Sequence, residues 1–535
     1  MERDRHRRLY DLHSWTGITL GWFVYLVTLT GCFALFEKEI RTWEDPARRL
    51  TLPAQGAPMQ SALERFVAEA SAGMEIRFVA FTPATGIEPY HAARVGTRAT
   101  DGTSGMVHRR WNVATGEPLP EHAMGLSEWL LEFHRSLMWP DAWGGYRVGR
   151  TLVGIAGVAL LLSLLTGALI HTKWARSFHV LRVDRSDRLR WQDLHKVLGL
   201  WLLPFASAIA ATGAMLGMVV VSPAAVFLAI GGDRSAIDRG NRPPPAPPTA
   251  ERAATAMLPI ERFLEIRHPA TGHVPALVQF RRWGEPDATA ELRFPVEERL
   301  ARYEIRVVNA VSAAEVPGHA GNRPVTTAQR LYGTVAPLHF GTYGTLATKV
   351  VYALLGTLLA IAVLLGNAMW ISRRSRLGAV STASRRYRRL DRANVGIALG
   401  IPLATFACFH ADKLWFGAAG SPRVGIGAVY LSVAAATGLY AAVRSDRDAA
   451  LRELLRLLAG LCVGVPLVDA ATGGGLVAIE DLGRGVPHAW VNASALLTGL
   501  AIWAATPGLS RFAARSARRA AAARGDADAD EGTRA

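Results

Sequence analysis

Apolar runs recur along the 535-residue chain, and several are long enough to cross a membrane. A membrane-spanning helix needs about 20 predominantly apolar residues. Charge-free runs of this kind are 14–36, 151–172, 197–232, 350–372, 393–411, 424–443 and 489–510. The run 197–232 exceeds one crossing, and we expect Pro223 to end its helix. An eighth candidate, 452–471, has charges at both ends. The pattern predicts an α-helical polytopic membrane protein with about eight spans.

The orientation of these spans follows from Lys and Arg near their ends, because cytoplasmic loops of membrane proteins are enriched in both. The basic segments are the N-terminal start, loop 173–196, loop 373–392 and the tail after 510. Loop 373–392 alone has eight Arg and one Asp. All four segments lie on one side if the spans alternate, so we expect both termini in the cytoplasm.

Two long segments then face outward, into the periplasm. In the first, residues 59–70 form an amphipathic helical stretch, and alternating β-rich pieces follow. The second has a similar pattern, so we expect two small modules, each with a helix and an antiparallel sheet, that fold as separate units. The expected order along the chain is the start and span 1 (1–37), module 1 (38–147), spans 2 and 3 with a basic loop (148–221), module 2 (222–345), span 4 (346–372), a basic loop (373–392), four further spans (393–510) and a tail (511–535).

An internal repeat relates the first four spans. Asp-Leu-His opens span 1 at 11–13 and span 3 at 193–195, and a Thr-Gly pair follows each His at the same offsets, at 30–31 and 212–213. Each span leads into an outer module that ends with a His before the next span. Residues 11–172 and 193–372 are therefore interpreted as two copies of one unit, related by a pseudo-twofold axis along the membrane normal.

Five of the fifteen histidines stand out by their position in this repeat. His13, His171 and His195 lie at the cytoplasmic ends of spans 1, 2 and 3, whereas His134 and His339 precede spans 2 and 4 at the outer face. Ionisable residues at membrane depth are functional candidates, and helix bundles can hold haem between two axial His side chains.

The two layers of His predict two b-type haems, since most of a ~30 Å hydrocarbon core separates them. His134 and His339 form the outer pair. The inner pair is open, because His13 with His195 and His171 with His195 are both reasonable. A single His would more simply be an interfacial anchor. His410 and His488 have no partner in the repeat, and we expect structural roles for them.

Composition narrows the function further. The net charge of +16 could indicate nucleic-acid binding, but the Arg cluster in short loops beside apolar runs, so we expect none. Three distant cysteines with no CxxC argue against a disulfide framework, an iron–sulfur cluster and covalent c-type haem. The chain contains no GxGxxG motif that opens a soluble domain, so we expect no built-in NAD- or flavin-binding domain.

The chain resembles the PepSY-associated transmembrane family, also called the iron-regulated PepSY membrane proteins. The matching pieces are DLHSWTGITLGW, TGCFALFEKEIRTWEDP, FHRSL, the stretch from His171 to Phe205 and PLHFGTYG. Span 4 departs from the pattern, with Leu365-Gly366 where span 2 has Thr166-Gly167. The resemblance covers roughly residues 8–375. It implies PepSY-like folds for the two outer modules and a haem-dependent reductase of the bacterial inner membrane that releases iron from ferric siderophores.

The sequence is therefore compatible with three functions. The first is a haem-dependent reductase that passes electrons from quinol or a cytoplasmic reductase to a ferric siderophore or another Fe(III) chelate. The second is a non-enzymatic PepSY module that binds or regulates a periplasmic partner, and the third is a transporter, because parallel repeats are common there. A red protein with bis-His haem bands would favour the first.

Overall fold

The fold is described from a computed structural model. It describes residues 2–120, 125–171, 178, 182, 187–218, 255–295, 303–316, 327–377, 382–416, 423–475 and 479–508. Pro223, at which the sequence analysis ended a helix, lies outside these residues. The chain divides into two compact units, which are described separately: a helical unit (1–44, 123–217 and 350–535) and a sheet unit (45–122 and 218–349).

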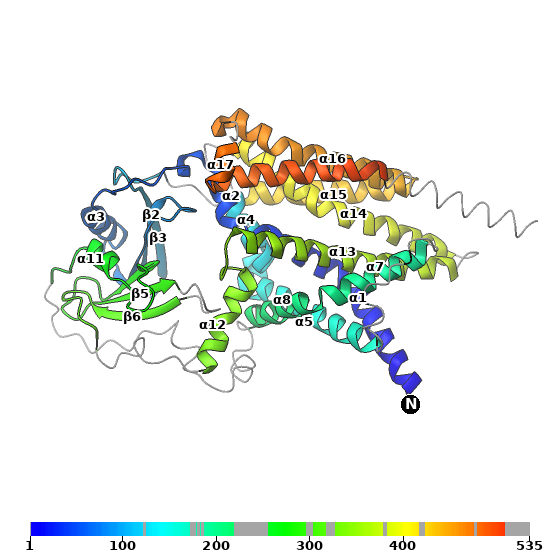
Figure 1. The fold of residues 1–535 in the computed structure, drawn as a ribbon, viewed down its shortest axis with the longest axis horizontal. Helices are drawn as coiled ribbons and strands as arrows, with labels where there is room; N and C mark the ends of the chain where they lie inside the picture. Colours follow the sequence, from blue (N-terminus) through cyan, green and yellow to red (C-terminus); the bar gives the residue numbers. More distant parts are fainter. Residues whose placement is uncertain are drawn as a thin grey trace, which may run out of the picture. The chain divides into compact units, whose positions relative to one another are not determined.

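The helical unit contains the membrane spans (Figure 1). Seven described helices are long and apolar enough to cross a membrane, or eight if one bent pair counts as a span. The helices are α1 (Glu2–Ala34), α5 (Gly145–Ile170), α13 (Leu346–Leu377), α14 (Thr382–Ala411), α15 (Arg423–Val443), α16 (Arg447–Asp469) and a last helix over 487–508. The prediction of about eight spans is confirmed, including the charged candidate at 452–471, which lies within the span Arg447–Gly474 that begins with α16. The chain is therefore a multi-pass membrane protein.

The bent pair replaces the single third span that the sequence predicted. It consists of α7 (Asp187–Trp201) and α8 (Leu203–Met218), whose axes differ by 65° at a break at Leu202. Pro204 lies just inside α8, at a position where its missing N–H costs no helical hydrogen bond. The bend sets the two halves of this span at different angles to its neighbours.

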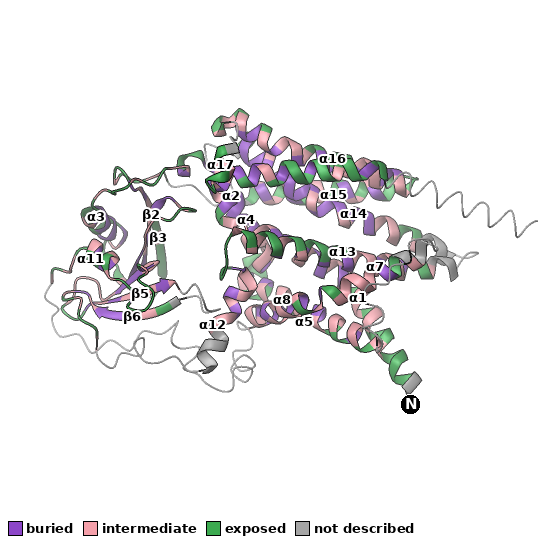
Figure 2. Cartoon of the chain, in the orientation of Figure 1, coloured by how far each residue is buried: buried purple, intermediate pink, exposed green. Residues whose placement is uncertain are grey.

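Two cores hold the helical unit together. One is built mainly by α1, α5, α8 and α13, with Ala156, Ala206 and Leu359 buried in it. The other joins α1 and the last four helices, with Leu403, Cys408 and Val465 in its interior. α14, coloured largely as buried in Figure 2, is the most buried of the seven spans: 67% of its most apolar stretch is buried, against 22% for α15.

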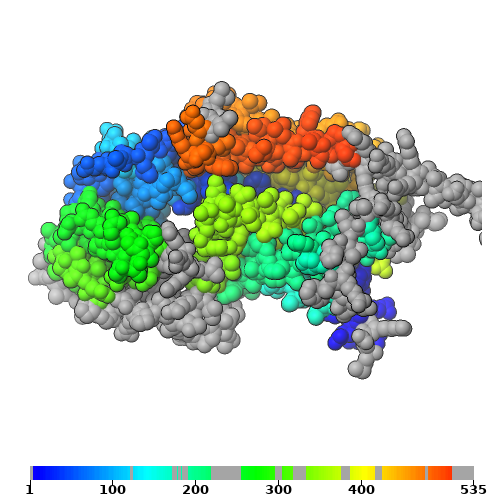
Figure 3. All heavy atoms as spheres, viewed as in Figure 1, coloured from blue at the N-terminus to red at the C-terminus, as the bar shows by residue number. Residues whose placement is uncertain are grey.

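The outer surface of the last helices is apolar, as expected of a lipid-facing surface. Leu457, Leu467, Leu497 and Trp503 are exposed on α16 and the last helix, which appear in orange to red on one face of the unit in Figure 3. In a soluble protein such a large apolar surface would be unusual. The helical unit therefore matches a bilayer environment.

The sheet unit holds one six-stranded antiparallel sheet with the order β3-β2-β1-β4-β5-β6. The strands are β1 (Glu75–Thr82), β2 (Tyr90–Arg98), β3 (Ser104–Asn112), β4 (Leu277–Arg281), β5 (Thr289–Pro295) and β6 (Tyr303–Asn309). Each expected module contributes a three-stranded meander and one helix, α3 (Gln60–Ala70) or α11 (Ile260–Glu265). The sequence pattern did not predict β2, because its residues YHAARVGTR lack a clear alternation of apolar and polar positions.

The two modules are not separate folding units, and that expectation is wrong. β1 pairs with β4 through Val79–Phe280, Ala80–Gln279 and Phe81–Val278, so the meanders share one sheet and one core. The helices also exchange contacts: Glu261 Oε1 accepts from the backbone N–H of Met59 (2.6 Å), and Gln60 Oε1 accepts from that of Ile260 (2.8 Å). Each helix therefore helps to satisfy the free N–H groups at the start of the other.

Candidate cofactor site

A cavity of about 1440 Å³ lies inside the helical unit and is lined by α1, α5, α7, α13, α14 and α16. This is larger than the roughly 300–1,000 Å³ of an ordinary ligand pocket. His13, His171 and His195, the three histidines of the predicted inner layer, all line it. The cavity thus brings together residues that are up to 182 positions apart in the sequence.

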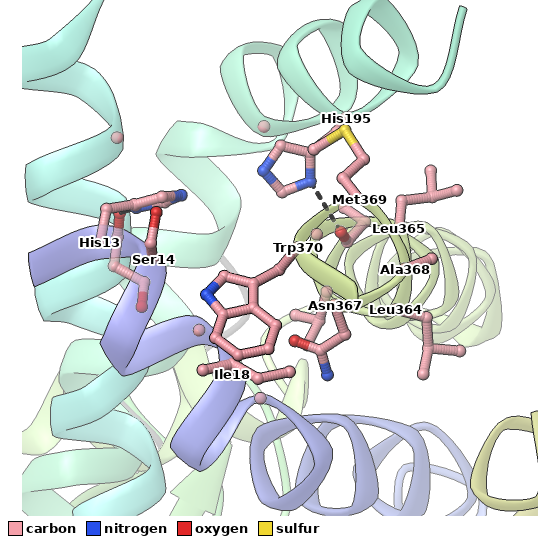
Figure 4. Close-up of a pocket in the computed structure, with 18 of the residues that line it drawn as sticks. His13, Ser14, Ile18, His195, Leu364, Leu365, Asn367, Ala368, Met369 and Trp370 are labelled. Atoms are coloured by element: carbon pink, nitrogen blue, oxygen red, sulfur yellow. Dashed lines mark hydrogen bonds between the residues drawn. The ribbon is translucent and has the colours of Figure 1, made fainter. Parts of the chain in front are cut away.

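His13 and His195 form a close pair across this cavity. Their ring centroids are 6.2 Å apart and their planes differ by 63°. Figure 4 shows the two imidazoles pointing toward one another from different helices, with Trp370 beside them. Imidazole nitrogens bind metal ions at about 2.0–2.1 Å, so two imidazoles on opposite sides of one metal have centroids roughly 6 Å apart. The observed spacing fits that geometry.

Each imidazole of this pair is oriented by a backbone carbonyl on the facing helix. Nδ1 of His13 donates to Ser163 O (3.0 Å) on α5, and Nδ1 of His195 donates to Ala362 O (2.8 Å) on α13. A hydrogen bond from Nδ1 fixes the tautomer in which Nε2 is free, and metal-binding histidines typically have such a partner. Both rings are therefore prepared to bind a metal through Nε2.

The glycines of the repeated motif make these hydrogen bonds possible. Gly167 lies four residues after Ser163, and a Cβ built on it would lie 3.2 Å from Cε1 of His13. Gly366 lies four residues after Ala362, and its Cβ would lie 3.0 Å from Cε1 of His195. Without a side chain at these positions the imidazole can reach the helix backbone. Both glycines were noted in the sequence, but their contact with an imidazole on another helix could not be predicted from it.

Thr166 adds a second contact at the first of these sites only. Its Oγ1 lies 3.2 Å from Nδ1 of His13. The corresponding position in span 4 is Leu365, which has no hydroxyl group. His195 nevertheless keeps its carbonyl partner, so the glycine and the carbonyl, not the threonine, are common to both sites.

A second pair of glycines leaves space beside the rings. Gly17 and Gly199 each lie four residues after a histidine of the pair, so each lies on the same helix face as that His. Both line the cavity, and a Cβ built at either would meet nothing within 4 Å. The repeat therefore provides, on two helices, a His that can bind metal and an open surface one turn away.

His171 lies near this pair, at the end of α5, and no hydrogen bond of its ring orients it among the contacts described. The structure therefore distinguishes His13 and His195, with one ring nitrogen fixed and the other directed into the cavity, from His171.

The outer-layer histidines lie in different units. His134, on α4 (Leu126–Ser136), repeats the device of the inner pair, since its Nδ1 donates to Val27 O (3.1 Å) on α1, and Gly31 lies four residues later. Burial lowers the pKa of His134, so its ring stays neutral, as a metal ligand must be. His339 lies on α12 (Thr327–Phe340) in the sheet unit, and its pairing with His134 stays a prediction.

The donor set fits haem better than a bare metal ion. Among the described residues, no three His, Cys, Asp or Glu side chains gather into a metal site. Haem iron needs only two axial ligands from the protein. Two facing imidazoles, a large cavity and Gly17 and Gly199 beside the rings suit a flat macrocycle.

Comparison with known proteins places the chain in a family. The family model described as the PepSY-associated TM region matches residues 10–373. The chain belongs to the PepSY-associated TM family. A relative, the uncharacterised protein PA4219 of Pseudomonas aeruginosa, is 29% identical over 302 residues, which cover 51% of this chain and 69% of the relative. The match ends near the end of span 4, so the last four spans lie outside the family region.

Proposed function

We propose that this PepSY-associated TM protein is a haem b-containing reductase of the bacterial inner membrane, with both termini in the cytoplasm. It passes electrons across the membrane to a ferric siderophore or another Fe(III) chelate in the periplasm. The observation that carries the proposal is the His13–His195 pair, with its 6.2 Å spacing and its two Nδ1 hydrogen bonds.

His13 and His195 would hold the inner haem, and His134 and His339 the outer one. Haem supplies reversible one-electron chemistry when it is bound. The protein contributes the rest: carbonyls on α5 and α13 keep both Nε2 atoms directed into the cavity, and the apolar helices restrict water around it. The electron donor is a quinol or a cytoplasmic reductase.

The reaction helps iron release because of the preferences of the metal. Siderophores hold Fe(III) mainly through hard oxygen donors, whereas Fe(II) is softer and is held more weakly by them. One electron transferred to the chelate converts Fe(III) to Fe(II), and the donor loses that electron. The sheet unit is the part of the chain that would meet such a chelate.

The test uses the full chain, purified from cells supplied with haem. We expect a red protein with low-spin bis-His bands and about two haems per chain, and an Fe(III)–siderophore complex should reoxidise the reduced protein. Replacement of His339 with Ala should lower the haem content by about half, leave the inner-haem spectrum intact and stop reduction of the external chelate.

Two results would contradict parts of this proposal. A colourless protein that takes up no haem on reconstitution would favour a PepSY module that binds a partner without redox chemistry. Full haem content, an unchanged spectrum and wild-type chelate reduction in the His339→Ala variant would show that His339 is not a ligand of the outer haem.

A further inference from the structure

Two arginines at the end of α13 face the cavity. Arg373 and Arg374 both line it, and among the described residues neither forms an ion pair. Arg373 Nη1 instead donates to the hydroxyl of Tyr10 (2.7 Å), and the Arg374 guanidinium lies 3.8 Å from the ring centroid of Trp370. Tyr10 and Trp370 thus position two cations that no carboxylate of the described residues neutralises.

The other cations of the cavity wall differ, because they are paired. Arg182 and Lys196 both bind Asp193, at 2.8 and 3.2 Å, and Arg447 binds Asp391 at 2.7 Å. The lining holds five Arg and Lys side chains and three Asp, so the cations exceed the carboxylates by two. The third Asp, Asp11, is exposed and forms no ion pair with the described residues.

The arginines lie on the helix that also orients one of the facing imidazoles. Ala362 O, which accepts from His195, and Gly366 beside that ring belong to α13. Arg373 and Arg374 follow Gly366 by seven and eight residues, about 10–12 Å further along the helix axis. One helix therefore carries both the support of the His pair and the unpaired cations near the cytoplasmic end of the cavity.

We propose that Arg373 and Arg374 bind the two propionate carboxylates of the haem held between His13 and His195. This inference rests on the proposed function. Guanidinium groups bind carboxylates through two parallel hydrogen bonds, and a pair preorganised by aromatic contacts loses little freedom when it does so. A lipid phosphate would offer the same anionic chemistry, so the test must separate the two sources.

The experiment compares haem with haem dimethyl ester, in which both carboxylates are esterified and uncharged. Apoprotein of the full chain is titrated with each compound, for wild type, for Arg373→Gln/Arg374→Gln and for the control Arg386→Gln/Arg389→Gln. The control removes two exposed arginines at the start of α14, in the same basic segment 373–392, that do not line the cavity. It therefore reproduces the loss of charge near the membrane without touching the site.

We expect wild type and control to prefer haem over its ester at the inner site by about tenfold, since screening limits the strength of partly exposed pairs. In Arg373→Gln/Arg374→Gln this preference should fall to near one, while the bis-His band positions stay unchanged because both axial ligands remain. The midpoint potential of the inner haem should shift as well, as an effect of lost charge beside the iron.

Three other outcomes overturn the inference and differ from one another. If the arginine variant keeps the wild-type preference, the two arginines do not bind the propionates. If it keeps that preference but loses affinity for anionic vesicles, while the control does not, the arginines bind lipid phosphate. If wild type binds neither compound, the proposed function fails together with this inference.

Discussion

Two histidines, His195 and His410, show how differently the repeat region and the last four spans use the same side chain. Both lie on membrane helices, and both bond to a backbone carbonyl on a facing helix. His195 donates through Nδ1 and keeps Nε2 for the cavity. His410 uses Nε2 itself, toward Leu461 O (2.9 Å), beside a glycine at 464. His195, with Nε2 free, is therefore a candidate metal ligand, whereas His410, whose Nε2 is hydrogen-bonded, is interpreted as a structural residue.

A buried ion pair and its hydrogen bonds connect several of the last four spans. Lys413 lies at the end of α14, and its Nζ is 3.0 Å from Asp469 Oδ1 and 2.7 Å from Trp43 O. Asn492 Nδ2 donates to Asp469 Oδ2, and Trp43 Nε1 donates to Asn492 Oδ1, both at 2.8 Å. All four residues are buried, so this network lies in the interior of the helical unit.

The comparison suggests different tasks for the two regions. In the repeat region, two fixed imidazoles and two cations with no ion pair among the described residues line a large cavity, to which α14 and α16 also contribute. In the last four spans, buried charges satisfy each other and join α14, α16 and the last helix to Trp43 on α2 (Glu37–Glu44). Buried ion pairs of this type fix a packing arrangement more than they add stability. We therefore interpret the last four spans as a scaffold for the repeat region.

The largest expected effect separates the two histidines directly. His195→Ala should remove one ligand of the inner haem, so the haem content of the purified protein should fall by about half. His410→Ala should leave the haem content and band positions unchanged, and its effect should be a loss of stability only. Pyridine haemochrome assays on both variants measure this. Equal haem loss in the two would erase the distinction.

The second effect concerns the buried pair. Asp469→Ala would leave Lys413 charged and buried without its partner, and breaking a buried pair costs about 3–5 kcal/mol. Lys413→Met/Asp469→Leu should recover most of that loss, because it removes both charges together. Unfolding in a denaturing detergent titration measures the change.

Haem content distinguishes the scaffold from the site in these variants. The haem-to-protein ratio of the folded fraction should stay at the wild-type value in the single and double variants. If Asp469→Ala changes the inner-haem spectrum while the protein remains folded, the network belongs to the redox machinery and the scaffold interpretation is wrong.

Much of the helical fold, and part of the candidate site, could be predicted from the sequence. Hydropathy and the repeat predicted the spans and placed His13 and His195 at corresponding positions, since both signals are local or periodic. It could not choose between His171 and His13, because that choice depends on which ring meets a carbonyl on another helix. Nor could it show that β1 pairs with β4, since edge pairing depends on how two distant meanders meet. The sequence also did not predict the ion pairs of Asp193 and Asp469, because their partners approach them only in the folded chain.

A smaller effect tests the open surface beside the His pair. Gly199→Leu should place a side chain in the cavity without a clash in the protein, because a Cβ there meets nothing within 4 Å. We expect haem affinity at the inner site to fall by about tenfold or more, with little change in folding. Gly460→Leu is the matched control, since Gly460 has equally open space on exposed α16. Haem titration of both apoproteins measures the difference.

The smallest effect concerns the hydroxyl that only one inner site has. Thr166→Val removes the Oγ1 contact to His13 but keeps the volume and the Ser163 carbonyl, so we expect a cost of about 0.5–1.5 kcal/mol in haem binding. Thr437→Val, in the last four spans, removes a hydroxyl that donates to Val433 O one turn earlier in the same helix, and haem binding should not change. Haem dissociation rates of the two variants measure the contrast. Because Leu365 already lacks this hydroxyl beside His195, a large loss in Thr166→Val would mean that the two inner ligands are not supported in the same way.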